Sequence, residues 1–89
     1  MNPLDRRAIG RTSLEVTQLG FGAGTLGDPF EVVAESDAQA TFAAAWEEGL
    51  RFFDTAPWYG NTKSEHRLGA FLRARPRDAF VLSTKVGRL

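Results

Sequence analysis

The sequence of 89 residues contains no cysteine, only one histidine and no excess of charge of either sign. The lack of cysteine excludes disulfides, thiolate metal sites and a cysteine nucleophile, and we expect no metal site. Eleven Lys and Arg residues balance eleven Asp and Glu residues, and no basic run interrupts this balance. The charge pattern therefore does not favour a nucleic-acid partner.

Long apolar runs are also lacking. The longest are far shorter than the ~20 residues that cross a bilayer, and the first residues have no apolar stretch typical of a secretory signal. We therefore expect a cytoplasmic protein without a membrane partner. The hydrophobic content of 43% is sufficient for some core, as in one small domain or part of a larger one.

Glycine, proline and apolar periodicity divide the chain into alternating strands and helices. Residues 7–17 predict a short hairpin, and apolar segments at 18–22, 50–54 and 79–85 predict three strands. A helix is predicted over residues 37–48, where Ser36 and Gln39 form a capping-box pattern. A second helix is predicted after Ser64, taken as its N-cap, and it ends near Arg75 and Pro76.

The glycine-rich segment 23–29 is predicted to be an irregular loop. Strand and helix then alternate with a period of about 30 residues, which predicts βαβ units and a parallel sheet in an α/β fold. Eight such units make about 250 residues, the usual size of a (β/α)8 barrel. Residues 1–89 hold only two units and a third strand, so we expect one incomplete domain that needs the remainder of a barrel.

Three polar side chains are predicted to meet at the carboxyl edge of this sheet. Asp54 and Lys85 each stand where a strand ends, and Tyr59 follows Asp54 in a polar loop. Sites in α/β folds form at this edge. A phenol exchanges protons poorly at neutral pH unless a cation stabilises its charged form, and a carboxylate can keep that cation charged. Singly, each residue has a structural explanation; together they favour carbonyl or alcohol chemistry.

The amino-acid sequence of several segments resembles that of the aldo-keto reductase family. Residues 53–60 read FDTAPWYG and residues 64–69 read SEHRLG, and the likeness extends through LGFG at 19–22 to STKVG at 83–87. The chain looks most like the branch that includes bacterial aldose and fucose dehydrogenases and pyridoxal 4-dehydrogenase. The resemblance implies the N-terminal portion of a (β/α)8 TIM barrel, consisting of a hairpin and then a β-α-β-α-β run.

The resemblance also implies roles for individual residues. Tyr59 would be the general acid or base of a hydride transfer between NADP or NAD and a carbonyl, aldehyde or sugar substrate. Lys85 and Asp54 would tune Tyr59, and Trp58 would line the substrate pocket. The residues implied to bind the cofactor are Gly22, Ala23, Gly24 and Asp54. The family's fourth catalytic residue, a histidine after the next strand, would lie beyond residue 89, so the chain alone is expected to be inactive. His66 is not assigned to that role.

One departure from the family pattern lies after Tyr59. Many relatives have a second glycine where this chain has Thr62, in the segment Gly60-Asn61-Thr62-Lys63. Threonine lacks the freedom of glycine at positive φ, so the loop shape and the substrate fit are expected to differ.

Two other functions remain open from the sequence. Residues 22–27 match GxGxxG, as in a Rossmann dinucleotide site, although Pro29 and the late cap at Ser36 separate the glycines from the helix. Some relatives of the aldo-keto reductase fold, such as potassium-channel β subunits, bind nicotinamide and serve mainly as regulatory partners. A nicotinamide-binding regulatory or structural subunit is therefore a further alternative.

Overall fold

A hairpin and a small parallel sheet form the β-structure of the described residues. The computed structural model describes residues 2–27 and 32–87. β1 (Arg6–Ala8) pairs with β2 (Glu15–Thr17) in an antiparallel hairpin, which confirms the hairpin predicted over residues 7–17. In the second sheet, β4 (Phe52–Asp54) lies between β3 (Phe21–Gly22) and β5 (Val81–Ser83), and both pairings are parallel.

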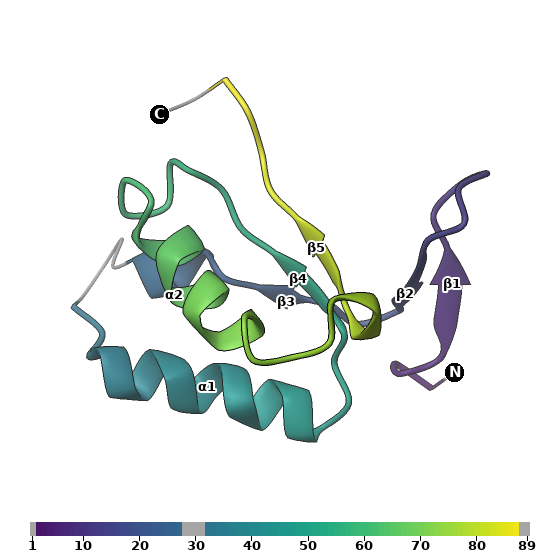
Figure 1. Ribbon diagram of the computed structural model, residues 1–89, viewed down its shortest axis with the longest axis horizontal. Helices are drawn as coiled ribbons and strands as arrows, with labels where there is room; N and C mark the ends of the chain where they lie inside the picture. The colour runs from purple at the N-terminus through teal and green to yellow at the C-terminus, as the bar shows by residue number, and fades with distance from the viewer. Residues whose placement is uncertain (1, 28–31, 88–89) are drawn as a thin grey trace.

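Helices connect the parallel strands, as the alternation in the sequence predicts. α1 (Glu35–Glu47) lies between β3 and β4 in the sequence, and α2 (Lys63–Leu72) lies between β4 and β5. Figure 1 shows both helices on the same side of the sheet, with the hairpin beyond the end at which the strands begin. None of the helices within residues 2–27 and 32–87 is long and apolar enough to cross a membrane.

Aromatic rings fill the space between the helices and the sheet. Phe53, in the middle of β4, has no exposed surface, and its ring lies 6.3 Å from Trp46 of α1 and 6.4 Å from Phe71 of α2. Phe42 of α1 is also fully buried and lies 5.5 Å from Phe71. Offset and tilted rings at these distances add to the apolar burial that holds a sheet against its helices.

The strands are shorter than the predicted segments, because residues at their amino ends hydrogen-bond elsewhere. Leu50 donates its amide to Ala45 O in the turn that ends α1, and the Arg51 amide points to Thr17 Oγ1 at 3.5 Å. Before β5, Arg77–Ala79 form a 3-10 helix, η2, where the sequence predicts the third strand to start. α2 likewise ends at Leu72, before the predicted end near Arg75 and Pro76.

Both predicted serine caps are wrong. α1 begins at Glu35, so Ser36 lies inside the helix, and Gln39 Nε2 donates to Glu35 and to the backbone oxygen of Arg67. Ser64 lies inside α2, which begins at Lys63, and its buried hydroxyl makes tertiary contacts. In both places a partner from another element outweighs the local capping pattern.

The glycine-rich segment is more regular than predicted. Gly24–Gly27 form a 3-10 helix, η1, immediately after β3. The rest of the predicted loop, Asp28 and Pro29, lies outside the described residues.

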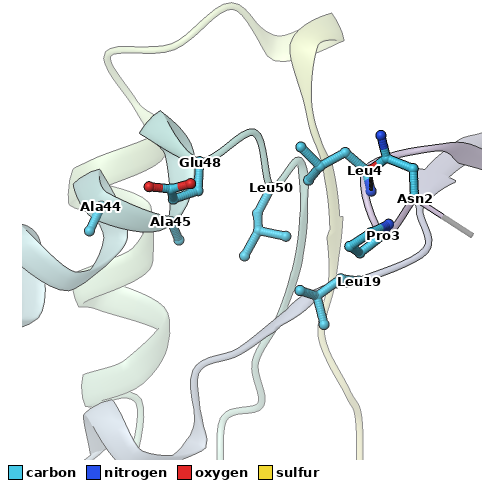
Figure 2. Close-up of a pocket in the computed structure, with 8 residues that line it drawn as sticks. All are labelled: Asn2, Pro3, Leu4, Leu19, Ala44, Ala45, Glu48 and Leu50. Atoms are coloured by element: carbon cyan, nitrogen blue, oxygen red, sulfur yellow. Dashed lines mark hydrogen bonds between the residues drawn. The ribbon is translucent and has the colours of Figure 1, made fainter.

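A groove of about 480 Å³ lies at the amino end of the parallel sheet, where the strands begin. Figure 2 shows Leu4, Leu19 and Leu50 around it, between the N-terminal segment and the end of α1. Because Leu19 precedes β3 and Leu50 precedes β4, the groove is separated by the length of the strands from the polar residues that follow them.

We expect Phe42→Ala to lower the free energy of unfolding by about 3–5 kcal/mol, because it opens a cavity between α1 and α2. Urea unfolding of the chain followed by the fluorescence of Trp46 and Trp58 measures this change. Leu14→Ala is the control, since Leu14 is 49% exposed and lies outside the core. Equal losses in the two variants would show that the aromatic cluster is not the core of the fold.

Candidate active site

Asp54 occupies the point at which the three parallel strands end. It is the last residue of β4 and stands in register with Gly22 of β3 and Ser83 of β5. Its backbone oxygen accepts a hydrogen bond of 2.9 Å from the Ala23 amide, and the next residue, Thr55, donates its amide to Ser83 O at 2.9 Å. The backbone thus fixes Asp54 between its two neighbouring strands.

The carboxylate of Asp54 binds two side chains from the β5 segment. Lys85 Nζ lies 2.9 Å from Oδ2 and 3.1 Å from Oδ1. The Ser83 hydroxyl donates to Oδ1 at 2.5 Å. Lys85 also donates to the backbone oxygen of Thr55 at 2.9 Å, so the ammonium group is bound both by Asp54 and by the residue that follows β4.

Each member of the ion pair favours the charged form of the other. Burial raises the pKa of Asp54, but the hydrogen bonds from Ser83 and Lys85 and the charge of Lys85 outweigh burial, so the pKa lies below its ordinary value. The hydrogen bond to Asp54 is the main cause that raises the pKa of Lys85; desolvation opposes it, and the charge of Asp54 and the proximity of Tyr59 add to it. Their side chains are 41% and 49% exposed, so solvent screens the attraction.

Tyr59 lies beside this ion pair. Lys85 Nζ is 5.3 Å from the centre of the Tyr59 ring, within the range of a cation–π contact. On another side the ring packs against Gly24 of η1, where an added Cβ atom would lie 3.6 Å from Tyr59 Cζ. The structure therefore brings together Asp54, Tyr59 and Lys85, as the sequence predicts.

The loop that carries Tyr59 crosses η1 at backbone distance. A Cβ atom on Gly27 would lie 2.5 Å from the carbonyl carbon of Tyr59, and one on Gly60 would meet the backbone of Gly27. The two backbones can come this close because neither Gly27 nor Gly60 has a Cβ atom. Gly60 also has a φ of 67°, which favours glycine. The crossing of Gly27 and Gly60 therefore restrains the position of the Tyr59 backbone relative to η1.

A buried pair of hydroxyl groups, from Thr55 and Ser64, lies at the two ends of the loop that carries Tyr59. Ser64 Oγ donates to Ala23 O at 2.8 Å and lies 2.6 Å from Thr55 Oγ1. Ala23 follows β3, Thr55 follows β4 and Ser64 is in the first turn of α2. The pair thus joins three segments that surround the site.

Comparison with known proteins places this arrangement in a family. The sequence profile described as "Aldo/keto reductase family" matches residues 18–89, which is most of the chain. The chain belongs to the aldo/keto reductase family.

Two relatives and one solved structure illustrate the likeness. The chain is 51% identical over 85 residues to a pyridoxal 4-dehydrogenase from Microbacterium luteolum, and 49% identical over 82 residues to a D-threo-aldose 1-dehydrogenase from a Pseudomonas species. These matches cover 96% and 92% of this chain and 25% of each relative. An aldo-keto reductase from Bacillus halodurans, solved in its holo form, is 33% identical with a TM-score of 0.81, over 92% of this chain and 26% of that protein.

The fold prediction is confirmed by these likenesses. The chain spans about a quarter of the length of the relatives that it matches. The hairpin and the β3-α1-β4-α2-β5 run are an N-terminal portion of the TIM barrel of this family. The Rossmann interpretation of residues 22–27 is wrong: η1 follows β3, and α1 begins only at Glu35.

The other residues predicted for the site differ in their accessibility. Gly22 is exposed, and an added Cβ atom there would meet nothing within 4 Å. Gly24 lies under Tyr59, but Ala23 is fully buried in the core and does not line the surface of the site. Trp58 is 49% exposed beside Tyr59. His66 is exposed on α2.

Sequence reasoning missed Ser83 and Arg67. Ser83 precedes Lys85 by two residues, and residues two apart on a strand face the same side, so its proximity to Asp54 could have been inferred. Arg67 is 8% exposed and donates to the backbone oxygens of Leu26 and Val33 and to Glu35. No local pattern around Arg67 indicates these long-range partners.

Thr62 adopts the backbone conformation that the family's second glycine would favour. Its φ is 79°, directly after Gly60 and Asn61, which also have positive φ. Threonine thus keeps a left-handed conformation that a β-branched side chain disfavours. The expected difference in loop shape and substrate fit stays a prediction.

We expect Thr62→Gly to raise the free energy of unfolding by about 1 kcal/mol, because relief of the strain exceeds the entropy that glycine adds to the unfolded chain. Urea unfolding measures the change. Thr41→Gly in the middle of α1 is the control and should instead lower stability by roughly 0.5–1 kcal/mol. A loss of stability in both variants would contradict strain at Thr62.

The pH dependence of stability should reveal the Asp54–Lys85 pair. The folded pKa of Asp54 lies below its ordinary value of 3.8, so its contribution is present above that value and is lost as the pH falls through the folded pKa. The folded pKa of Lys85 lies above 10.5, so its contribution is present below 10.5 and is lost as the pH rises through the folded pKa.

Asp54→Asn should therefore destabilise the chain in the intermediate pH range, and its difference from the unsubstituted chain should shrink at both extremes. Urea unfolding at a series of pH values measures this difference. The matched control is Lys85→Met, alone and combined with Asp54→Asn. A difference that is the same at all pH values would contradict a stabilising ion pair.

Proposed function

We propose that this chain forms part of the active site of an NAD(P)-dependent oxidoreductase that acts on an aldose, another sugar or an aldehyde. The observation that carries the proposal is the convergence of Asp54, Lys85 and Tyr59 at the carboxyl edge of the sheet. The similarity to an aldose dehydrogenase and a pyridoxal dehydrogenase supports this substrate class.

Tyr59 is the proposed proton-transfer residue. Oxidation of an alcohol removes a hydride from carbon and a proton from oxygen, and reduction of a carbonyl reverses both steps. Nicotinamide supplies the hydride acceptor or donor when it is bound. The phenol oxygen of Tyr59 accepts or returns the proton, and the ammonium group of Lys85, held by Asp54, offsets the negative charge that the phenol gains on losing its proton.

Two glycines lie close to these residues at the same edge of the sheet. Gly22 offers open space on β3, at the position in register with Asp54, and Gly24 packs under the ring of Tyr59. We propose that Gly22, Gly24 and Asp54 contact the nicotinamide, while Ala23 acts by fixing the backbone between the two glycines. The half-exposed ring of Trp58 would form a wall of the substrate pocket.

The required remainder of the barrel can be supplied by a relative. In a hybrid protein, this chain replaces the matching N-terminal quarter of the pyridoxal 4-dehydrogenase from Microbacterium luteolum. We expect the hybrid to oxidise or reduce pyridoxal or a member of a panel of aldoses and aldehydes, as measured by nicotinamide absorbance. The separate 89-residue chain should show no turnover.

Tyr59→Phe in the hybrid should lower kcat by about 10²–10⁴-fold and leave nicotinamide binding unchanged, because the phenol oxygen is lost and the ring is kept. Thr41→Ala, which removes an exposed hydroxyl on α1, is the control. A folded hybrid that binds nicotinamide but turns over no substrate would support a binding or regulatory role instead. Turnover that survives Tyr59→Phe would contradict the role of Tyr59.

A further inference from the structure

Ser83 is the closest side-chain neighbour of Asp54 within the described site. Its hydroxyl donates to Asp54 Oδ1 at 2.5 Å, a shorter distance than either contact from Lys85 Nζ. Hydrogen bonds from a hydroxyl to an ionised carboxylate are among the strong ones. The carboxylate therefore has a second partner that carries no charge.

The register of the sheet places Ser83 beside Asp54. Ser83 stands directly beside Asp54 across the β4–β5 pairing, and the Thr55 amide binds Ser83 O one step further along. Lys85 follows Ser83 by two residues, so the same side of the segment delivers both donors to one carboxylate. Asp54 is thus bound by Ser83 at the end of β5 and by Lys85 two residues later.

Ser83 and Lys85 restrain the carboxylate of Asp54 in different ways. Lys85 Nζ contacts both oxygens, but it stands at the end of a long side chain that is 49% exposed. Ser83 has a short side chain on a paired strand, so its donor has little freedom to move. A fixed Oδ1 leaves Oδ2 directed at the ammonium group, which in turn lies beside the Tyr59 ring.

We propose that Ser83 is a positioning residue, which locks the carboxylate of Asp54 so that Lys85 is held toward Tyr59. This inference rests on the proposed function for its catalytic consequence, but the contact itself does not depend on activity. The Ser83 hydrogen bond is also one of the causes that lower the pKa of Asp54, in agreement with a donor aimed at the ionised form.

The neighbouring hydroxyl provides a matched control. Thr84 Oγ1 donates to Glu65 Oε2 at 2.7 Å, on a different partner from that of Ser83. Thr84→Val removes this hydroxyl from the same segment and leaves the donors to Asp54 in place. Ser83→Ala removes the donor to Asp54, and Ser83→Thr keeps a hydroxyl at that position.

The first test is the carboxyl titration of Asp54 in the folded hybrid with the relative's barrel, which does not require activity. It is followed by ¹³C NMR with labelled aspartate and assigned with Asp54→Asn. Ser83→Ala should raise the pKa of Asp54, because the ionised carboxylate loses a donor. Ser83→Thr should stay closer to the unsubstituted chain, and Thr84→Val should leave the pKa where it was. An unchanged pKa in Ser83→Ala would overturn the proposal, since a purely packing role would not affect the titration.

The second test uses the active hybrid with the relative's barrel. Ser83→Ala should lower kcat by about threefold to tenfold, the range that one hydrogen bond can account for, with little change in the KM for nicotinamide. Ser83→Thr should recover most of the loss. An unchanged kcat would overturn the positioning role. If the hybrid itself is inactive, the proposed function fails while the titration still decides whether Ser83 locks Asp54.

Discussion

The site depends on Asp54, because this one residue ties together the ends of three strands. Its backbone oxygen binds the amide of Ala23 after β3, and its carboxylate binds Ser83 and Lys85 from the β5 segment. A parallel sheet orders its strands by backbone pairing, but pairing alone does not place side chains in a site. Here the last residue of the central strand serves both purposes, so the geometry of the sheet and the geometry of the ion pair are set together.

The sequence predicts the order of the elements well because apolar periodicity reflects burial. Phe53 and Phe42 are fully buried where the strand and helix patterns place them. The convergence of Asp54, Tyr59 and Lys85 is also predictable, since the carboxyl ends of parallel strands meet at one edge. What the sequence could not provide is the choice among competing partners. Ser64 is a residue type that favours helix N-caps, but its hydroxyl donates to Ala23 O, because α2 packs against the segment that follows β3.

Thr62 shows a related limit of local rules. A β-branched residue disfavours positive φ, yet the loop keeps a φ of 79° at this position. The surrounding contacts explain why the strain is tolerated. The Thr62 amide donates to Pro57 O at 2.8 Å, its oxygen accepts from the His66 amide, and Gly60 crosses Gly27 without space for a side chain. Backbone contacts on both sides thus hold this conformation.

The contacts that join Asp54, Ser83, Lys85 and Tyr59 lie within the described part of this chain, although the chain spans only about a quarter of its relatives. Asp54, Ser83 and Lys85 are bound to one another, and the Tyr59 loop is fixed by the crossing of Gly27 and Gly60. A large cofactor and a substrate need additional walls, whereas these side chains contact one another directly. A proton-transfer group is useful only when its neighbours are fixed before the substrate binds. The supporting carboxylate ends β4, the cation follows β5 and the proposed acid stands in one loop, so direct contacts among them meet this need.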